Sequence, residues 1–252
     1  MVNPSTSERS PLSPTPSTPD SFVWWRSLVL AALLFVALAI GIVFALLVVR
    51  VAHVPLGDPR HPSLTWGVVI GQILLYIPVL AVLIAFLPWV AQRPLADLGF
   101  RLPGPREISF GVTGGVVMLI VALAVAAIQY ALLHLKTEQL PVQLLARAHD
   151  PALVAGFALL AIVVAPFAEE FVFRGFVFNA LRRYLPVPVA IVLSAAIFGL
   201  AHADMSAFAP LMAGGIVLAW VYWRSGSLAC SMLSHATFNT VQVLLIVFAH
   251  QT

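Results

Sequence analysis

Long runs of apolar residues, separated by short polar segments, make up most of this chain of 252 residues. The first run, Leu28 to Val49, has 22 residues, enough to cross a hydrocarbon layer of about 30 Å as an α-helix. It also exceeds the roughly 7–15 apolar residues of a signal-peptide core. Backbone amides inside a bilayer need internal hydrogen bonds, so such runs form helices there. The runs therefore predict an all-α, polytopic membrane bundle.

Six further apolar runs bring the predicted number of transmembrane helices to about seven. They cover residues 68–91, 110–135, 152–184, 188–205, 207–223 and 228–249. Only 9% of all residues are charged and 61% are hydrophobic, so the chain cannot cover a soluble domain with polar surface. The 13 Lys and Arg residues lie mostly between the runs, a distribution that argues against nucleic-acid binding. We expect a protein embedded in the lipid bilayer.

Composition divides the chain into three parts. Residues 1–22 are rich in Ser, Thr and Pro and predict a disordered tail, because they bury too little apolar surface to offset the entropy of ordering. Residues 23–150 contain the N-terminal transmembrane helices and their loops, and residues 151–250 contain most of the intramembrane polar residues. The single cysteine, Cys230, excludes an intrachain disulfide and a cysteine-rich metal site.

The distribution of basic residues over the loops predicts the orientation in the membrane. Nine Lys and Arg residues fall on the side of the N-terminus and four on the opposite side. Cytoplasmic loops carry an excess of these residues. We therefore expect a multi-pass protein of the plasma membrane with its N-terminus in the cytoplasm.

A small set of polar residues lies within the apolar runs, where an ionisable side chain costs about 2.5–3.5 kcal/mol on insertion and so marks a candidate functional site. The set consists of Glu169, Glu170 and Arg174 in the fourth run, His202 and Asp204 at the end of the fifth, and His235 and Asn239 in the seventh. We assign Asp204 to a solvated helix end. A single His or Asn in a membrane helix most often makes a packing hydrogen bond, but the complete set has no such structural explanation.

Helix geometry groups these side chains. Glu170 and Arg174 are four residues apart with the acid first, the favoured order for an ion pair, whereas Glu169 lies about 100° around the helix and has no obvious partner there. The prolines of the turn 185–188 fold the fourth and fifth runs into a hairpin. In this hairpin Glu170 and His202 both lie about 21 Å from the turn. A carboxylate and an imidazole therefore share one depth.

The seventh run adds a second imidazole and an amide. His235 and Asn239 are four residues apart, so they share one helix face, about 10 and 17 Å from the start of the run. A carboxylate beside an imidazole can activate water, and the amide with the second imidazole can stabilise an oxyanion. This combination fits peptide-bond hydrolysis. The chain has no H-E-x-x-H zinc motif and no pair of intramembrane aspartates.

The same residues carry a resemblance to a known family. Glu169-Glu170-x-x-x-Arg174, Phe198-x-x-x-His202 and His235-x-x-x-Asn239, in this order, resemble the three motifs of the CPBP family of intramembrane proteases. This family is also called the Abi or CAAX-protease-and-bacteriocin-processing family and includes the type II CAAX prenyl endopeptidases. The resemblance covers about residues 165–240. It implies that residues 151–250 form the catalytic core.

The resemblance also implies an activity and a role for each residue. Glu169 would be the catalytic carboxylate and His202 its partner in activating water, with support from Glu170 and Arg174. His235 and Asn239 would form the oxyanion site. The implied mechanism is of the glutamate type and uses no cofactor; the alternative is a zinc ion held by the same Glu and His side chains. The substrate would be a membrane-embedded or lipidated, CAAX-like peptide or protein.

Other functions stay open at this point. A non-catalytic membrane scaffold or a bacteriocin-immunity protein of the same fold would not need an intact acid and base. A proton-coupled transporter could use the same Glu and His, but the hydropathy pattern shows no inverted repeat. For an enzyme, the depth of the polar residues below the turns 185–188 and 226–227 predicts that the substrate enters from the cytoplasm.

Overall fold

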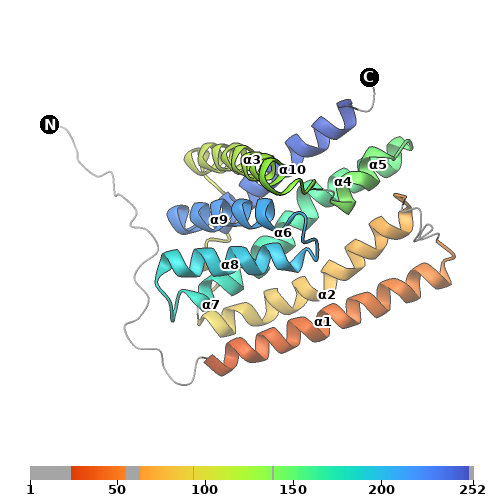
Figure 1. Ribbon diagram of the computed structural model, residues 1–252. Coiled ribbons are helices and arrows are strands. Elements are labelled where there is room, and N and C mark those ends of the chain that lie inside the picture. Colours follow the sequence, from red (N-terminus) through yellow and green to blue (C-terminus); the bar gives the residue numbers. More distant parts are fainter. Residues whose placement is uncertain (1–23, 55–62, 93, 138, 250–252) are drawn as a thin grey trace.

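The computed structural model describes residues 24–54, 63–92, 94–137 and 139–249, and every regular element in these ranges is a helix (Figure 1). The tail predicted for residues 1–22 lies outside the described residues. The helices are α1 (Trp24–Val51), α2 (Trp66–Ala91), α3 (Pro105–Leu133), α4 (Leu140–Ala146), α5 (Pro151–Leu159), α6 (Ala165–Glu170), α7 (Asn179–Leu181), α8 (Val187–Ala201), α9 (Phe208–Ser225) and α10 (Leu228–Ala249).

The fourth predicted span is one continuous helix with two changes of winding. Two π-helical segments, Leu160–Val164 (η2) and Phe171–Phe178 (η3), join α5, α6 and α7 into a single rod, Pro151–Leu181. A π-helical turn frees backbone groups and changes the direction of side chains, and it often occurs at functional sites. The two segments flank α6, which carries both glutamates of the first motif.

The predicted helical membrane bundle is confirmed. Within the described residues, five helices are long and apolar enough to cross a membrane: Trp25–Val51, Trp66–Ala91, Pro105–Leu133, Pro151–Leu181 and Leu228–Ala249. The two remaining predicted spans form shorter helices, α8 with 15 residues and α9 with 18. The predicted span 188–205 is helical only as far as Ala201, because the chain turns after this residue. Helix α4 was not predicted.

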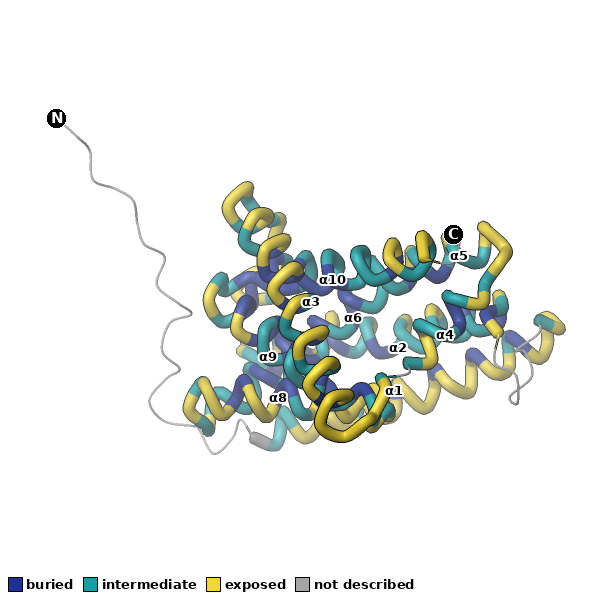
Figure 2. Tube along the Cα trace, turned by 45° about the horizontal axis from the view of Figure 1, so that its top comes forward, coloured by how far each residue is buried: buried dark blue, intermediate teal, exposed yellow. Residues whose placement is uncertain are grey.

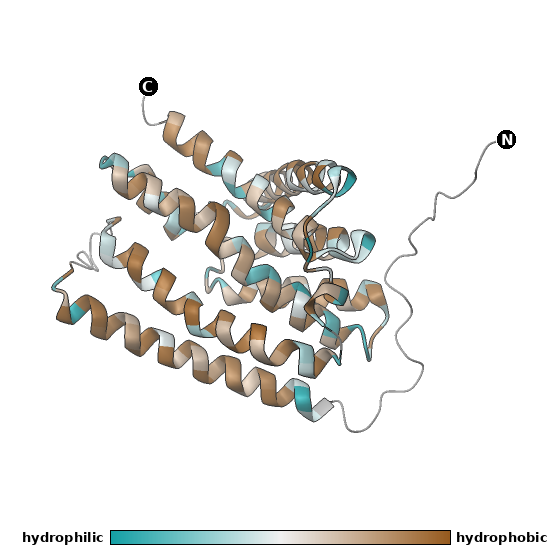
Figure 3. Ribbon diagram, turned by 180° about the vertical axis from the view of Figure 1, so that it is seen from behind, coloured by the Kyte–Doolittle hydropathy of each residue, from teal (hydrophilic) through white to brown (hydrophobic). Residues whose placement is uncertain are grey.

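The helices pack into a layered bundle. Helices α1 and α2 form an antiparallel pair along one edge, and α3, α9 and α10 pack together on the opposite side, with α8 against α9 (Figure 1). Buried residues concentrate between the central helices, whereas most of α1 and α3 is exposed (Figure 2). Apolar residues run along α1 and α2 (Figure 3), and large exposed side chains such as Phe35 and Val43 suit contact with lipid.

A close backbone contact fixes the start of α10. Gly226 ends α9 with a positive φ of 62°, and the backbone N–H of Leu228 donates to the carbonyl of Gly99, 3.0 Å away. A Cβ atom on Gly99 would overlap the backbone of Gly226 and Ser227. This contact anchors α10, and thereby sets the depth of the polar residues that follow along the helix.

Candidate active site

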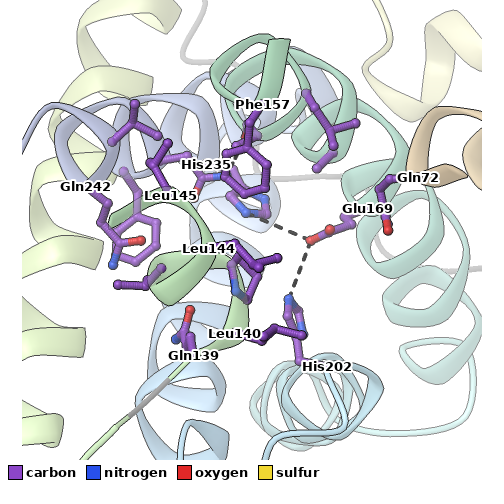
Figure 4. Close-up of a pocket in the computed structure, with 18 of the residues that line it drawn as sticks. Gln72, Gln139, Leu140, Leu144, Leu145, Phe157, Glu169, His202, His235 and Gln242 are labelled. Carbon is purple, nitrogen blue, oxygen red and sulfur yellow. Dashed lines mark hydrogen bonds and ion pairs between the residues drawn. The ribbon is translucent and has the colours of Figure 1, made fainter. Parts of the chain in front are cut away.

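The carboxylate of Glu169 lies between two imidazoles from different helices. Its Oε2 atom is 3.9 Å from Nε2 of His202, the residue that follows α8, and 3.9 Å from Nε2 of His235 in α10 (Figure 4). Both distances exceed those of a direct hydrogen bond and fit a bridging water molecule. The side chains of Glu169 and His202 are 18% and 32% exposed, so water and a substrate can reach them. Three helices thus meet at one carboxylate oxygen.

Glu170 has the opposite environment, because it is fully buried and paired. Its Oε1 atom accepts a hydrogen bond from Nη1 of Arg174 at 3.0 Å, which is the ion pair that the spacing predicted, and lies 3.0 Å from Nδ1 of His235. Its Oε2 atom accepts from the hydroxyl of Ser231 at 2.6 Å. A buried charge needs such partners to offset its loss of hydration. Glu170 is therefore held in a buried network, and Glu169 is the more exposed of the two acids.

Arg174 connects this buried network to α8 and α9. Its Nη2 atom donates to the carbonyl of Gly215 at 3.0 Å, and its guanidinium lies 4.8 Å from the ring centre of Phe198. The ring of Phe198 in turn contacts the imidazole of His202 edge-on, with 4.7 Å between ring centres. The Phe of the second motif thus separates the buried arginine from the exposed histidine and packs against both.

The hydrogen-bond partners fix the protonation pattern of the two imidazoles. Nδ1 of His202 lies 2.8 Å from the carbonyl of Phe198, and a carbonyl only accepts, so this nitrogen carries the proton. Nδ1 of His235 likewise donates to the carboxylate of Glu170. When either imidazole is neutral, its unprotonated Nε2 therefore points toward Glu169. In this tautomer Nε2 can accept a hydrogen bond.

The structure places Asn239 and Asp204 differently from the residues around Glu169. The amide of Asn239 donates to the carbonyl of Ala161, in the first π-helical segment, at 2.6 Å. An amide has two N–H groups, so one more is available to a ligand. Asp204 accepts from the backbone N–H groups of Ser206 and Ala207 just before α9. It belongs to a helix end, as predicted, and is not part of the site.

Two residues of the site were not identified from the sequence. The hydroxyl of Tyr76 in α2 donates to Oε1 of Glu169 at 3.1 Å, and Ser231 in α10 donates to Glu170. Tyrosine and serine residues are frequent in membrane helices, and no sequence motif marks these two as part of a site. The only sequence signal for Tyr76 is Gln72, four residues earlier on the same face of an otherwise apolar run.

A cavity of about 340 Å³ lies beside the carboxylate of Glu169. It is lined by polar residues of α2, by leucines of α4 and by the second half of α10, and Figure 4 shows the α4 leucines among these lining side chains. The lining includes Gln72, Tyr76, Leu140, Leu144, Phe157, Glu169, His202, His235, Asn239, Gln242 and Ile246. A mostly apolar pocket with a few convergent polar groups is typical of a site for a substrate.

The position of this cavity bears on the expected direction of substrate access, which stays a prediction. On α10 the lining runs from His235 to Ile246, away from the turn 226–227, and it includes α4, which lies beyond the far end of α3. The cavity therefore extends from Glu169, His202 and His235 in the direction away from the turns 185–188 and 226–227. The helix rise places Glu170 and His202 about 21 Å from the turn 185–188, past the middle of a layer of about 30 Å. This calculation could not reveal α4.

Among the described residues, no three His, Cys, Asp or Glu side chains are placed so that they could hold one metal ion. The zinc alternative stays a prediction for experiment.

Comparison with known proteins identifies a related family. Residues 151–241 match the family model described as type II CAAX prenyl endopeptidase Rce1-like. Over 87 residues the chain is 30% identical to a protein of Bacillus subtilis (strain 168) named "Putative membrane peptidase YdiL", an alignment that covers 34% of this chain. The chain spans 36% of the length of this curated relative. No solved structure matches the chain. All the motif residues, from Glu169 to Asn239 along the chain, lie inside the matched segment. The resemblance that these motifs indicated is confirmed, because residues 151–241 are similar to the Rce1-like family.

Proposed function

We propose that this protein is an intramembrane endopeptidase that hydrolyses a peptide bond of a membrane-bound or lipidated, CAAX-like substrate. The observation that carries the proposal is the position of Glu169 Oε2, 3.9 Å from Nε2 of both His202 and His235 and inside a cavity. The similarity of residues 151–241 to the Rce1-like family and the name of the Bacillus relative support the same class of activity.

The first chemical step uses Glu169 and His202. A water molecule between Oε2 of Glu169 and Nε2 of His202 can donate its two hydrogens to these two acceptors. As its oxygen attacks the carbonyl carbon of the substrate, one proton moves to Glu169, which acts as the general base. The proton then passes to the leaving nitrogen as the carbon–nitrogen bond breaks. The products are a new carboxylic acid and an amine, and transfer of the second water proton from the acid to the amine gives a carboxylate and an ammonium group.

The oxyanion of the tetrahedral intermediate is assigned to His235 and Asn239. Nδ1 of His235 already donates to Glu170, so Nε2 can donate to an oxyanion when the ring is an imidazolium. The hydrogen bond to Glu170 fixes the orientation of the ring, and Arg174 holds Glu170 in place. The second N–H of Asn239 is the other donor. Donors aimed at a developing charge supply a large part of the rate enhancement in acyl transfer.

Comparison of peptide termini in cells tests the proposal. Membranes from cells that produce the wild type and from cells that produce Glu169→Gln are digested, and the new carboxyl termini are compared by mass spectrometry. We expect at least one membrane peptide with a terminus that requires the wild type, and its uncut form accumulating with the variant. Identical termini in the two membranes would favour the non-catalytic scaffold or immunity function.

Metal removal separates the glutamate mechanism from the zinc alternative. We expect exhaustive chelation to leave the activity of the purified protein unchanged, because Glu169 and His202 activate water without a metal ion. Elemental analysis of the purified protein should give less than one equivalent of zinc. Stoichiometric zinc that is lost together with activity, and restores activity when it is added back, would contradict this prediction.

We further propose that the N-terminus is cytoplasmic and that the protein resides in the plasma membrane, from the distribution of basic residues over the loops. Arg224, at the end of α9, would then face the cytoplasm, whereas Arg147, after α4, would face outward; both are exposed. Single cysteines at these two positions, in a Cys230→Ser background, are treated with a membrane-impermeant thiol reagent. In intact cells we expect labelling at position 147 only. Labelling at position 224 only would invert the orientation and turn the cavity toward the cytoplasm.

A further inference from the structure

We propose that Tyr76 is a positioning residue for Glu169, an inference that rests on the proposed function. Tyr76 lies in α2, outside the segment that is similar to the Rce1-like family. Its hydroxyl donates a hydrogen bond to Oε1 of Glu169 at 3.1 Å, across 93 residues of sequence. The helix pair α1 and α2 thus contributes a contact to the candidate catalytic carboxylate.

The two oxygens of Glu169 have separate environments. Oε1 accepts from Tyr76, whereas Oε2 lies 3.9 Å from the Nε2 atoms of both His202 and His235. The last torsion of a glutamate side chain has broad, shallow minima, so an unrestrained carboxylate rotates easily. Among the described residues, Tyr76 makes the only direct hydrogen bond to Glu169 that the structure shows. This bond selects the rotation in which the other oxygen faces the histidines.

Space around Glu169 makes this restraint necessary. A second cavity, of about 580 Å³, lies between α1, α2 and the end of α8. It shares four lining residues with the first cavity: Gln72, Tyr76, Glu169 and His202. Glu169 therefore stands where two cavities meet, and its carboxylate has room to turn away from the histidines. The phenol of Tyr76 opposes that movement.

The type of donor also matters for the chemistry. Glu170 is held by the guanidinium of Arg174, which neutralises its charge. A tyrosine hydroxyl is neutral, so it orients Glu169 and leaves the carboxylate charge available for taking a proton from water. The adjacent acids of the first motif are therefore fixed in two different ways, one as a neutralised support and one as an oriented base.

Replacement of Tyr76 by Phe tests the inference through kinetics. The variant keeps the ring that lines both cavities and removes only the hydroxyl. We expect kcat to fall about 10- to 100-fold, the effect of losing a hydrogen bond to a charged group, with little change in KM or thermal stability. The matched control is Tyr222→Phe, because the hydroxyl of Tyr222 donates to the carbonyl of Leu98, away from the site. This control should lose stability but keep kcat per folded molecule.

A labelling experiment needs no substrate and so separates this inference from the proposed function. A hydrophobic carbodiimide is added to wild type and Tyr76→Phe, and modified carboxyl groups are mapped by mass spectrometry. We expect Glu169 to react about threefold faster or more in the variant, because its carboxylate has lost a hydrogen-bond partner. Glu170 is fully buried and should stay unmodified in both proteins.

The outcomes distinguish the two proposals. Unchanged kcat and unchanged labelling in Tyr76→Phe, with Glu169→Gln inactive, would overturn the positioning role and leave the peptidase intact. A fall in both thermal stability and kcat, together with a changed KM, would show that Tyr76 is merely structural. That result would also overturn the positioning role. If no peptide is cut by the wild type, the proposed function fails, and the labelling rate alone decides whether Tyr76 restrains Glu169.

Discussion

Replacement of Glu169 by Gln is expected to abolish peptide hydrolysis by the purified protein without lowering its abundance in the membrane. The amide has the volume of the carboxylate and can still accept the hydrogen bond from Tyr76, but it cannot take a proton from water. General-base catalysis contributes about 10²- to 10⁴-fold, so the residual rate should fall by at least that factor. Initial rates of cleavage in reconstituted vesicles, normalised to folded protein, measure the effect.

Glu107→Gln is the matched control for this experiment. Glu107 lies near the start of α3, where it pairs with Arg101 and accepts from the backbone N–H of Gly104. It has no contact with the cavity, so its replacement should leave the cleavage rate unchanged. Cleavage at the wild-type rate by Glu169→Gln would remove Glu169 from the mechanism.

Arg174→Ala is expected to have the largest effect on stability. The side chain of Arg174 is 1% exposed, and its removal leaves the fully buried Glu170 without its cation and opens a space beside Phe198. Loss of one partner of a buried ion pair costs about 3–5 kcal/mol. Abundance in the membrane, thermal unfolding and activity should therefore all decline. Abundance and unfolding temperature measured on the same preparations test this.

Two further variants sharpen the interpretation of Arg174. Arg174→Lys keeps the charge but cannot reach both Glu170 and the carbonyl of Gly215 with two separate N–H groups, so it should be intermediate. Arg101→Ala removes the partner of Glu107 at the surface, where the side chain of Arg101 is 38% exposed. Ion pairs of this kind contribute about 0–1 kcal/mol to the free energy of unfolding. If Arg174→Ala were as stable as Arg101→Ala, the buried network would not support the fold.

The sequence predicted those parts of the site that depend on regular helix spacing. Glu170 and Arg174 pair because four residues bring them to one helix face, and the proline turn brings His202 to the depth of the two glutamates. The bundle itself follows from the apolar runs, because a bilayer offers no partner for backbone amides. Each of these inferences uses contacts within one helix or one hairpin.

Contacts between distant helices and changes of helix winding could not be predicted in this way. The hydrogen bond from Tyr76 joins residues 93 positions apart, and neither hydropathy nor spacing specifies it. The π-helical segments on either side of α6 change the direction of the side chains, so a regular 3.6-residue turn did not reveal the bond from Asn239 to Ala161. Helix α4 has only seven residues, too few to form a recognisable span, yet it forms one wall of the cavity.

Cleavage in water enriched in oxygen-18 tests the central claim most directly. Wild-type protein in vesicles cuts its substrate peptide in this water, and both the product and the peptide that contains Glu169 are analysed by mass spectrometry over many turnovers. Direct attack by water predicts one oxygen-18 atom in the new carboxyl group and none in the carboxyl of Glu169. Oxygen-18 in Glu169 would show that this side chain attacks the substrate itself, and a product without the label would show that water is not the nucleophile; either result would contradict the mechanism.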